Sequence, residues 1–114
     1  KLVQVLVNLL QNASDALAAK TFADGESAEL RITHRRRPGA NSIVLRDNGP
    51  GMDRATREKI FDPFFTTKEV GKGVGLGLSI CYQIMAEHEG RIEVASEAGK
   101  YCEFALEFPE KPAE

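Results

Sequence analysis

The first twenty residues carry the pattern that most restricts this fold, a helical repeat in which almost every position outside one narrow strip is apolar. At about 100° per residue, the polar positions fall within an arc of roughly 100°. Such a helix is predicted to be largely buried, with the strip facing either bulk water or a cleft. The strip consists of Gln4, Asn8, Gln11, Asn12 and Asp15.

The composition of the strip favours a cleft. Faces exposed to bulk water usually carry lysine, glutamate and arginine, whereas this strip has two asparagines one turn apart and a single carboxylate. Asparagine is a poor helix former, and its oxygen is a neutral, hard ligand suited to Mg²⁺ that already binds phosphate. Asn8 and Asn12 are therefore candidate binding residues.

The rest of the chain alternates strand patterns, turns and helix patterns. We predict strands at 28–34 and 42–47 joined by a loop at 37–41, and a short helix from an Asp53 cap to about 60. A third helix at 78–89 stops at Gly90, and strands follow at 91–96 and 101–108. This order predicts an α+β two-layer sandwich, with helices on one face of a mixed, mostly antiparallel sheet.

The length of 114 residues, 42% of them hydrophobic, suits one compact core. We assign residues 1–108 to this domain and expect 109–114 to form a disordered tail. One face of the third helix is expected to supply core residues, namely Ile80, Cys81, Ile84, Met85 and His88.

A net charge of −2 gives no general attraction to nucleic acid or to an anionic membrane, so neither is an expected partner. No apolar run approaches the roughly 20 residues needed to span a bilayer, and we expect a soluble, cytoplasmic chain. Cys81 and Cys102 lack metal-ligand spacing and are expected to be free, buried thiols.

Two glycine-rich loops are candidates for a nucleotide site. The first, Asp47-Asn48-Gly49-Pro50-Gly51-Met52, follows a strand, and its glycines would let a flat ligand lie against the backbone. Asp47 can accept a hydrogen bond from an exocyclic amine such as that of adenine. The second loop, 71–78, opens into a helix whose first amides favour phosphate, but its spacing matches neither a Walker A loop nor a dinucleotide fingerprint. Each loop alone also suits an ordinary turn or a flexible connection.

Between these loops, three phenylalanines flank a proline in Ile60-Phe61-Asp62-Pro63-Phe64-Phe65. They either anchor a loop to the core or also form the hinge of a mobile lid spanning about 66–72.

Taken in order, the segments from 1 to 108 resemble the four signature boxes of the histidine-kinase catalytic domain, of the superfamily shared with gyrase, Hsp90 and MutL. Residues 8–13 resemble the N box, 47–52 the first glycine box, 61–64 the F box and 73–78 the second glycine box. The run 64–68 looks closest to kinases of the nitrogen-regulation and dicarboxylate-sensing type. The resemblance implies a Bergerat fold that binds ATP between the N-box helix and a flexible lid.

Carried over by position, the resemblance implies that Asn12 ligates Mg²⁺ and that Asn8 supports this site. Asp47 would recognise the adenine amino group, while Gly49 and Gly51 would let the base approach the backbone. The implied nucleotide site is completed by Asp15, Met52, Phe61, Phe64, Thr67, Lys68, Lys72, Gly73, Val74, Gly75, Leu76, Gly77 and Leu78.

Position 8 separates phosphotransfer from hydrolysis. Gyrase-like ATPases have a glutamate there that activates water, and Asn8 cannot act as a general base. The resemblance therefore implies transfer of the γ-phosphoryl group of ATP to a histidine on a separate dimerisation domain, through which a response regulator is reached. Neither His34 nor His88 lies in a phosphoacceptor motif.

Two features depart from the family pattern. Many histidine kinases have a basic residue where this chain has Asp15, which makes Lys68 and Lys72 candidate phosphate contacts. A strand that normally precedes the N box is missing, so the fragment is expected to lose stability. Three other readings stay open: an ATPase of the gyrase, Hsp90 or MutL type, a serine kinase like anti-sigma factors, and a nucleotide-binding module without catalysis.

Overall fold

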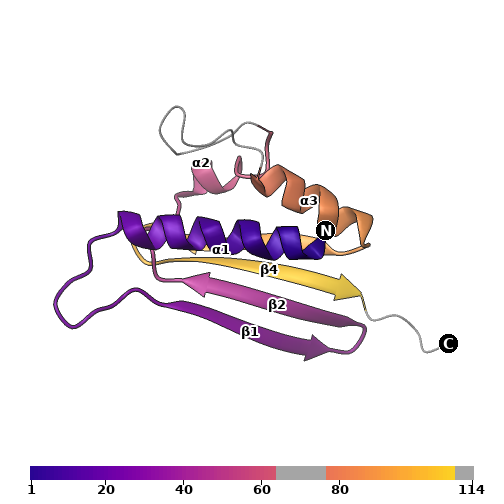
Figure 1. Ribbon diagram of the computed structural model, residues 1–114, viewed down its shortest axis with the longest axis horizontal. Helices are drawn as coiled ribbons and strands as arrows, with labels where there is room; N and C mark the ends of the chain where they lie inside the picture. The colour runs from indigo at the N-terminus through magenta and orange to yellow at the C-terminus, as the bar shows by residue number, and fades with distance from the viewer. Residues whose placement is uncertain (64–76, 110–114) are drawn as a thin grey trace.

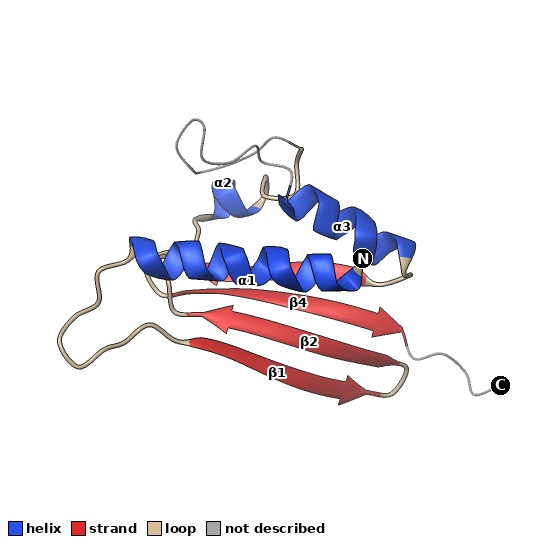
Figure 2. Ribbon diagram, viewed as in Figure 1, coloured by secondary structure: helices blue, strands red, loops and turns tan. Residues whose placement is uncertain are grey.

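The computed structural model describes residues 1–63 and 77–109. Their elements are α1 (Leu2–Ala19), β1 (Leu30–Arg37), β2 (Ala40–Asp47), α2 (Arg54–Arg57), α3 (Gly77–Glu87), β3 (Arg91–Glu97) and β4 (Tyr101–Pro109). Helices α1 and α3 pack against each other over one face of the sheet (Figure 1, Figure 2). The predicted α+β two-layer sandwich is confirmed.

The four described strands form one sheet in the order β1-β2-β4-β3, and all of their pairings are antiparallel. The β1–β2 turn consists of Pro38 and Gly39 alone, because Arg37 pairs directly with Ala40. Two residues suffice since Gly39 adopts a positive φ of 82°. The predicted loop between these two strands is confirmed, but it is shorter than 37–41, and β1 lies two to three residues later than the predicted strand 28–34.

The core lies between the inner face of the sheet and the two long helices. Alternate residues of β4 point into it, namely Cys102, Phe104 and Leu106, as the period of a strand requires. Pro109, which we assigned to the tail, is the last residue of β4 and pairs with Ala40.

Helix α3 contributes Cys81, Ile84 and Met85 to the core as predicted, but His88, which follows the last residue of the helix, is exposed. Both cysteines are free and buried, as expected. Burial raises the pKa of both thiols, and with the nearby charge of Asp47 it raises that of Cys102 to about 12.

Helix α1 is less buried than its sequence predicts. Its buried residues are Val5, Leu9 and Ala13 alone, whereas Val3 and Val7 are 71% and 56% exposed. The helix packs mainly on α3 at one side and on β2 beneath it. In the described part of the chain no other element covers the flank that carries Val3 and Val7, so the prediction of a largely buried helix is wrong.

The short helix α2 begins as predicted, because Asp53 Oδ1 accepts a hydrogen bond from the Thr56 N–H at 2.8 Å. It ends at Arg57, and turns rather than helix continue to Ile60.

Helix α3 ends in a Schellman turn that the sequence did not predict. Glu89, and not Gly90, has the left-handed φ of 60°. The Gly90 N–H donates to the Met85 carbonyl oxygen at 2.8 Å, which is the bond that defines this turn. Gly90 is required for a different reason, since a Cβ there would lie 2.6 Å from the Glu107 carbonyl oxygen.

Replacing Glu89 with glycine is expected to raise the free energy of unfolding by about 1 kcal/mol, because glycine adopts a positive φ without a Cβ clash. Thermal unfolding followed by circular dichroism measures the change. The matched control is Ala86→Gly, which introduces glycine within the last turn of α3 and should destabilise the protein by a similar amount. An unchanged or lower stability of Glu89→Gly would contradict this account of the turn.

Candidate functional site

The polar strip of α1 meets the start of α3. Asn8 is half-buried, and its Nδ2 donates to the Gly77 carbonyl oxygen at 3.4 Å and contacts Cys81 Sγ at 3.7 Å. Asn12, one turn further along, is also half-buried and has no side-chain hydrogen-bond partner among the described residues. Among the described residues, nothing competes with a ligand for its amide oxygen.

Asp15 lies beyond Asn12 on the same strip. It is exposed, and its Oδ1 accepts a hydrogen bond from Gln11 Nε2 at 3.0 Å. This bond joins two residues one turn apart on α1 and does not involve the amide of Asn12.

Asp47 ends β2 and is only 5% exposed. Its Oδ1 accepts a hydrogen bond from the Gly49 N–H at 2.9 Å, and its Oδ2 has no donor among the described residues. Burial raises the pKa of Asp47, while the bond from Gly49 and the charge of Lys20 oppose that rise. A buried carboxylate with one free oxygen is suited to a neutral donor such as the amino group of a purine.

The loop after Asp47 lies against the second half of α1. A Cβ on Gly49 would lie 3.3 Å from the Ala16 Cβ, and Ala16 is one turn beyond Asn12. The structure thus places the first glycine box against α1, one turn beyond Asn12 of the predicted N box.

Gly51 and Met52 fasten this loop to the β3–β4 hairpin. Gly51 has a φ of 63°, and a Cβ there would clash with the Glu97 carbonyl oxygen and lie 2.7 Å from that of Tyr101. The Met52 N–H donates to Ser96 Oγ at 2.7 Å. Gly51 is therefore required by the protein's own backbone, in addition to any role toward a ligand.

The F-box residue Phe61 and the α3 residue Leu78 are half-buried and pack on the core. The Phe61 ring lies 5.6 Å from the ring of Tyr82, so it anchors its segment to α3, which is the structural role that we considered for these aromatics. Gly77 is the exposed first residue of α3. The other predicted site residues lie outside the described residues: Phe64, Thr67, Lys68, Lys72, Gly73, Val74, Gly75 and Leu76.

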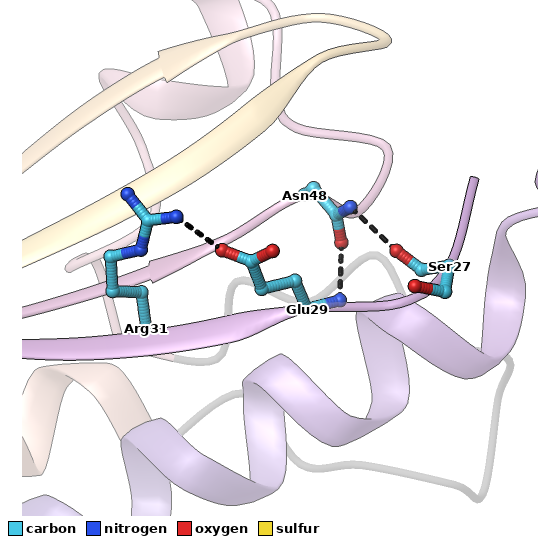
Figure 3. A network of polar contacts seen from close by, with 4 residues as sticks. All are labelled: Ser27, Glu29, Arg31 and Asn48. Atoms are coloured by element: carbon cyan, nitrogen blue, oxygen red, sulfur yellow. Dashed lines mark hydrogen bonds and ion pairs between the residues drawn. The ribbon is translucent and has the colours of Figure 1, made fainter. Parts of the chain in front are cut away.

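Sequence reasoning missed three side chains that hold the first glycine loop, those of Lys20, Asn48 and Ser96. Asn48 donates to the Ser27 carbonyl oxygen at 2.9 Å and accepts from the Glu29 N–H at 2.7 Å (Figure 3). Asparagine in a turn commonly bonds to nearby backbone, and this could have pointed to Asn48. Lys20 and Ser96 gave no such signal, because their partners are distant in the sequence.

A depression of about 250 Å³ lies beside the end of β2, but no residue of α1 lines it. The depression is lined by Glu29, Arg31, Arg46, Asp47 and Asn48. The candidate site lies instead where the loop after β2 contacts α1. In the described ranges, no group of three or more His, Cys, Asp or Glu residues could hold a metal ion. None of the helices in those ranges is both long and apolar enough to cross a bilayer.

The chain matches, over residues 1–112, the family model described as histidine kinase-, DNA gyrase B- and HSP90-like ATPase. It is 41% identical, over 97% of its length, to the signal transduction histidine-protein kinase AtoS of Escherichia coli (strain K12). It is also 41% identical, over 84% of its length, to the C4-dicarboxylate transport sensor protein DctB of Rhizobium meliloti (strain 1021). The chain covers 17% and 14% of these proteins, a small part of their length.

Among solved structures, the nucleotide-free catalytic domain of histidine kinase ThkA superposes with a TM-score of 0.75 and 38% identity, covering 96% of this chain and 67% of that one. ThkA in complex with the response regulator protein TrrA gives a TM-score of 0.73 and 34% identity, covering 97% of this chain and 29% of that one. The predicted resemblance is thereby confirmed. The family model and these relatives show that the chain belongs to the family of histidine kinase-, DNA gyrase B- and HSP90-like ATPases, on its histidine-kinase side.

Proposed function

We propose that residues 1–108 are the catalytic domain of a sensor histidine kinase, which binds Mg-ATP and transfers the γ-phosphoryl group to a histidine on a separate dimerisation domain. The observation that carries this proposal is the placement of two ligand-facing groups, one at the end of β2 and one on α1, where the loop after β2 packs on the helix. Asp47 has a carboxylate oxygen without a donor in the described chain, and the nearby Asn12 has an unpartnered amide. The first suits the base of the nucleotide and the second suits its phosphates.

Family membership implies that the chain uses ATP, and Mg²⁺ is part of our proposal. The residues fit this ion, because Mg²⁺ keeps several waters and needs few protein ligands when phosphates supply the rest. Asn12 would hold it, and the ion would neutralise phosphate charge. Asn8 would act as a support, since its amide already bonds to the Gly77 carbonyl oxygen at the start of α3.

The domain would mainly position the γ-phosphoryl group, as is usual for phosphoryl transfer. Asn8 has no basic group that could activate water, which favours transfer over hydrolysis. His34 and His88 are both exposed and lie away from the α1 strip in sequence, on β1 and after α3. We therefore assign the acceptor histidine to the dimerisation domain of the parent kinase and the later acceptor to a response regulator. The complex of the relative ThkA with TrrA supports this kind of partner.

The proposal predicts that Asn12→Ala weakens ATP binding about tenfold in the presence of Mg²⁺ and little in its absence, because only the metal contact is removed. Calorimetric titration with and without Mg²⁺ measures both affinities. Gln4→Ala is the matched control, since it removes an exposed amide from the same strip at its other end. Failure of the wild-type chain to bind ATP would overturn the proposed function, whereas equal losses with and without Mg²⁺ would remove only the metal role of Asn12.

Phosphotransfer is tested by adding a dimerisation domain that carries its acceptor histidine, together with labelled ATP. We expect acid-labile phosphohistidine on the added domain. Acid-stable phosphoserine would favour a serine kinase, and steady ATP turnover that depends on Asn8 would favour an ATPase. Tight ATP binding without any transfer would favour a nucleotide-binding module that lacks catalysis.

A further inference from the structure

The first glycine loop has an anchor that belongs to neither glycine box. Lys20, the half-buried residue that follows α1, donates from its Nζ to the carbonyl oxygens of Asn48 at 2.9 Å and Gly49 at 3.3 Å. The same Nζ donates to the Gly99 carbonyl oxygen, in the β3–β4 turn, at 3.2 Å. An ammonium group has three hydrogens, so these bonds use its full donor capacity.

The position of this ammonium group is fixed from a second side. Its Nζ lies 5.0 Å from the centroid of the Phe22 ring, within the range of a cation–π contact. The carbonyls and the ring come from three different segments of the chain. Lys20 therefore joins the end of α1, the loop and the β3–β4 turn at one point.

The contacts of the β3–β4 hairpin with the loop strengthen this junction. The Gly99 N–H donates to the Pro50 carbonyl oxygen at 2.6 Å. Ser96 Oγ accepts from the Met52 N–H and donates to the Tyr101 carbonyl oxygen, each at 2.7 Å. The loop that follows Asp47 is thus held along its length. Among the described residues, Lys20 is the only one whose positively charged side chain bonds to this loop.

We propose that Lys20 is a positioning residue for adenine recognition, which holds the loop in the conformation that presents Asp47 to the base. This role rests on the proposed function of the domain. Two of the bonded carbonyls, those of Asn48 and Gly49, immediately follow Asp47, so movement of the loop would also move the Gly49 N–H that orients its carboxylate.

The test compares three variants by calorimetric titration with ATP and ADP. Lys20→Met keeps the length of the side chain but removes its donors, and should weaken the binding of both nucleotides about tenfold. Lys20→Arg keeps the charge and should recover most of the affinity. The matched control is Lys100→Met, which removes an exposed lysine from the same hairpin turn; among the described residues this lysine pairs with Glu97 alone. It should bind like the wild type.

Two readouts separate positioning from a general loss of stability. The loss in Lys20→Met should be equal with and without Mg²⁺, because the change is at the base end of the nucleotide. The titratable groups that act on Asp47 among the described residues are Lys20 and, from β4, Cys102, whose thiol is uncharged at neutral pH. Without Lys20 the pKa of Asp47 rises further, so ADP affinity should begin to fall at a higher pH as the solution is acidified. Lys20→Arg should keep the wild-type pH profile.

Amide hydrogen exchange of the nucleotide-free protein completes the test, with faster exchange expected at Gly49 and Met52 in Lys20→Met. If this variant has no cooperative unfolding transition, Lys20→Gln replaces it, because it keeps a neutral donor. Unchanged affinity, pH profile and exchange in a folded variant would overturn the role of Lys20 while leaving the proposed function intact. A wild-type chain that binds no ATP would overturn both.

Discussion

Asp47→Asn is expected to weaken ATP and ADP binding about a hundredfold and to reduce the preference for adenine over guanine. The carboxylate has two acceptor oxygens, one of which receives the Gly49 N–H at 2.9 Å. Asparagine has only one acceptor oxygen, so if that oxygen stays with Gly49, the side chain turns an NH₂ donor toward the adenine amine. Its amide can instead donate to the O6 acceptor of guanine. Calorimetric titration with ADP and GDP measures both effects, and equal affinities in variant and wild type would remove Asp47 from the site.

The same substitution should leave the nucleotide-free protein at least as stable as the wild type at neutral pH. Burial raises the pKa of Asp47 in the folded state. The stability that this carboxyl contributes is therefore present below its unfolded pKa and is lost as the pH rises through its folded pKa. The advantage of Asp47→Asn over the wild type should shrink as the pH falls, as measured by urea unfolding at several pH values.

Asp53→Asn is the matched control with the opposite sign. Hydrogen bonds from Thr56 lower the pKa of Asp53. Its stabilisation is present above its unfolded pKa and is lost as the pH falls through its folded pKa. Asp53→Asn should therefore lose stability relative to the wild type at neutral pH and approach it in acid. Parallel pH curves for the two variants would contradict both assignments.

Gly51→Ala is expected to lower the free energy of unfolding by about 3 kcal/mol or more and to abolish detectable nucleotide binding. The alanine would have to adopt a φ of 63° and place its Cβ 2.7 Å from the Tyr101 carbonyl oxygen. To remove this clash, the loop has to move away from the β3–β4 hairpin. That movement would also displace Asp47 and Gly49. Urea unfolding and calorimetry measure the two losses.

Gly99→Ala separates the two causes of this loss. Gly99 has a φ of 82°, but nothing lies within 4 Å of the position of its Cβ. Its substitution costs only the strained backbone, about 1–2 kcal/mol. Similar losses in both variants would show that close packing of the loop on the hairpin contributes nothing.

The order of the elements could be predicted because it follows from local patterns. Alternation marks Cys102, Phe104 and Leu106 as inward residues of β4, and an aspartate before a short helix marks Asp53 as its cap. The local rule that a glycine ends a helix failed at the end of α3. Glycine is the usual left-handed residue at a helix end, but here Glu89 takes that position, while Gly90 leaves space for the carbonyl oxygen of Glu107.

The side chains that we propose to face the ligand stand out in the sequence, whereas the side chains that support them do not. Asn8, Asn12 and Asp47 have side chains whose chemistry stands out against their surroundings in the sequence. Lys20 does not, since a lysine after a helix is ordinary, and its partners lie up to 79 residues away. The exposure of Val3 could not be read from α1 either, because burial depends on which elements cover a helix.

The two native thiols are protected in a way that makes this domain suitable for site-specific fluorescent labelling. Both are enclosed in the core, and the raised pKa of Cys102, about 12, keeps that sulfur protonated in ordinary buffers. A maleimide dye would therefore attach selectively to a cysteine introduced at the surface, such as Gln83→Cys on the exposed side of α3. Fluorescence from that single label could follow nucleotide titrations without first engineering a cysteine-free background.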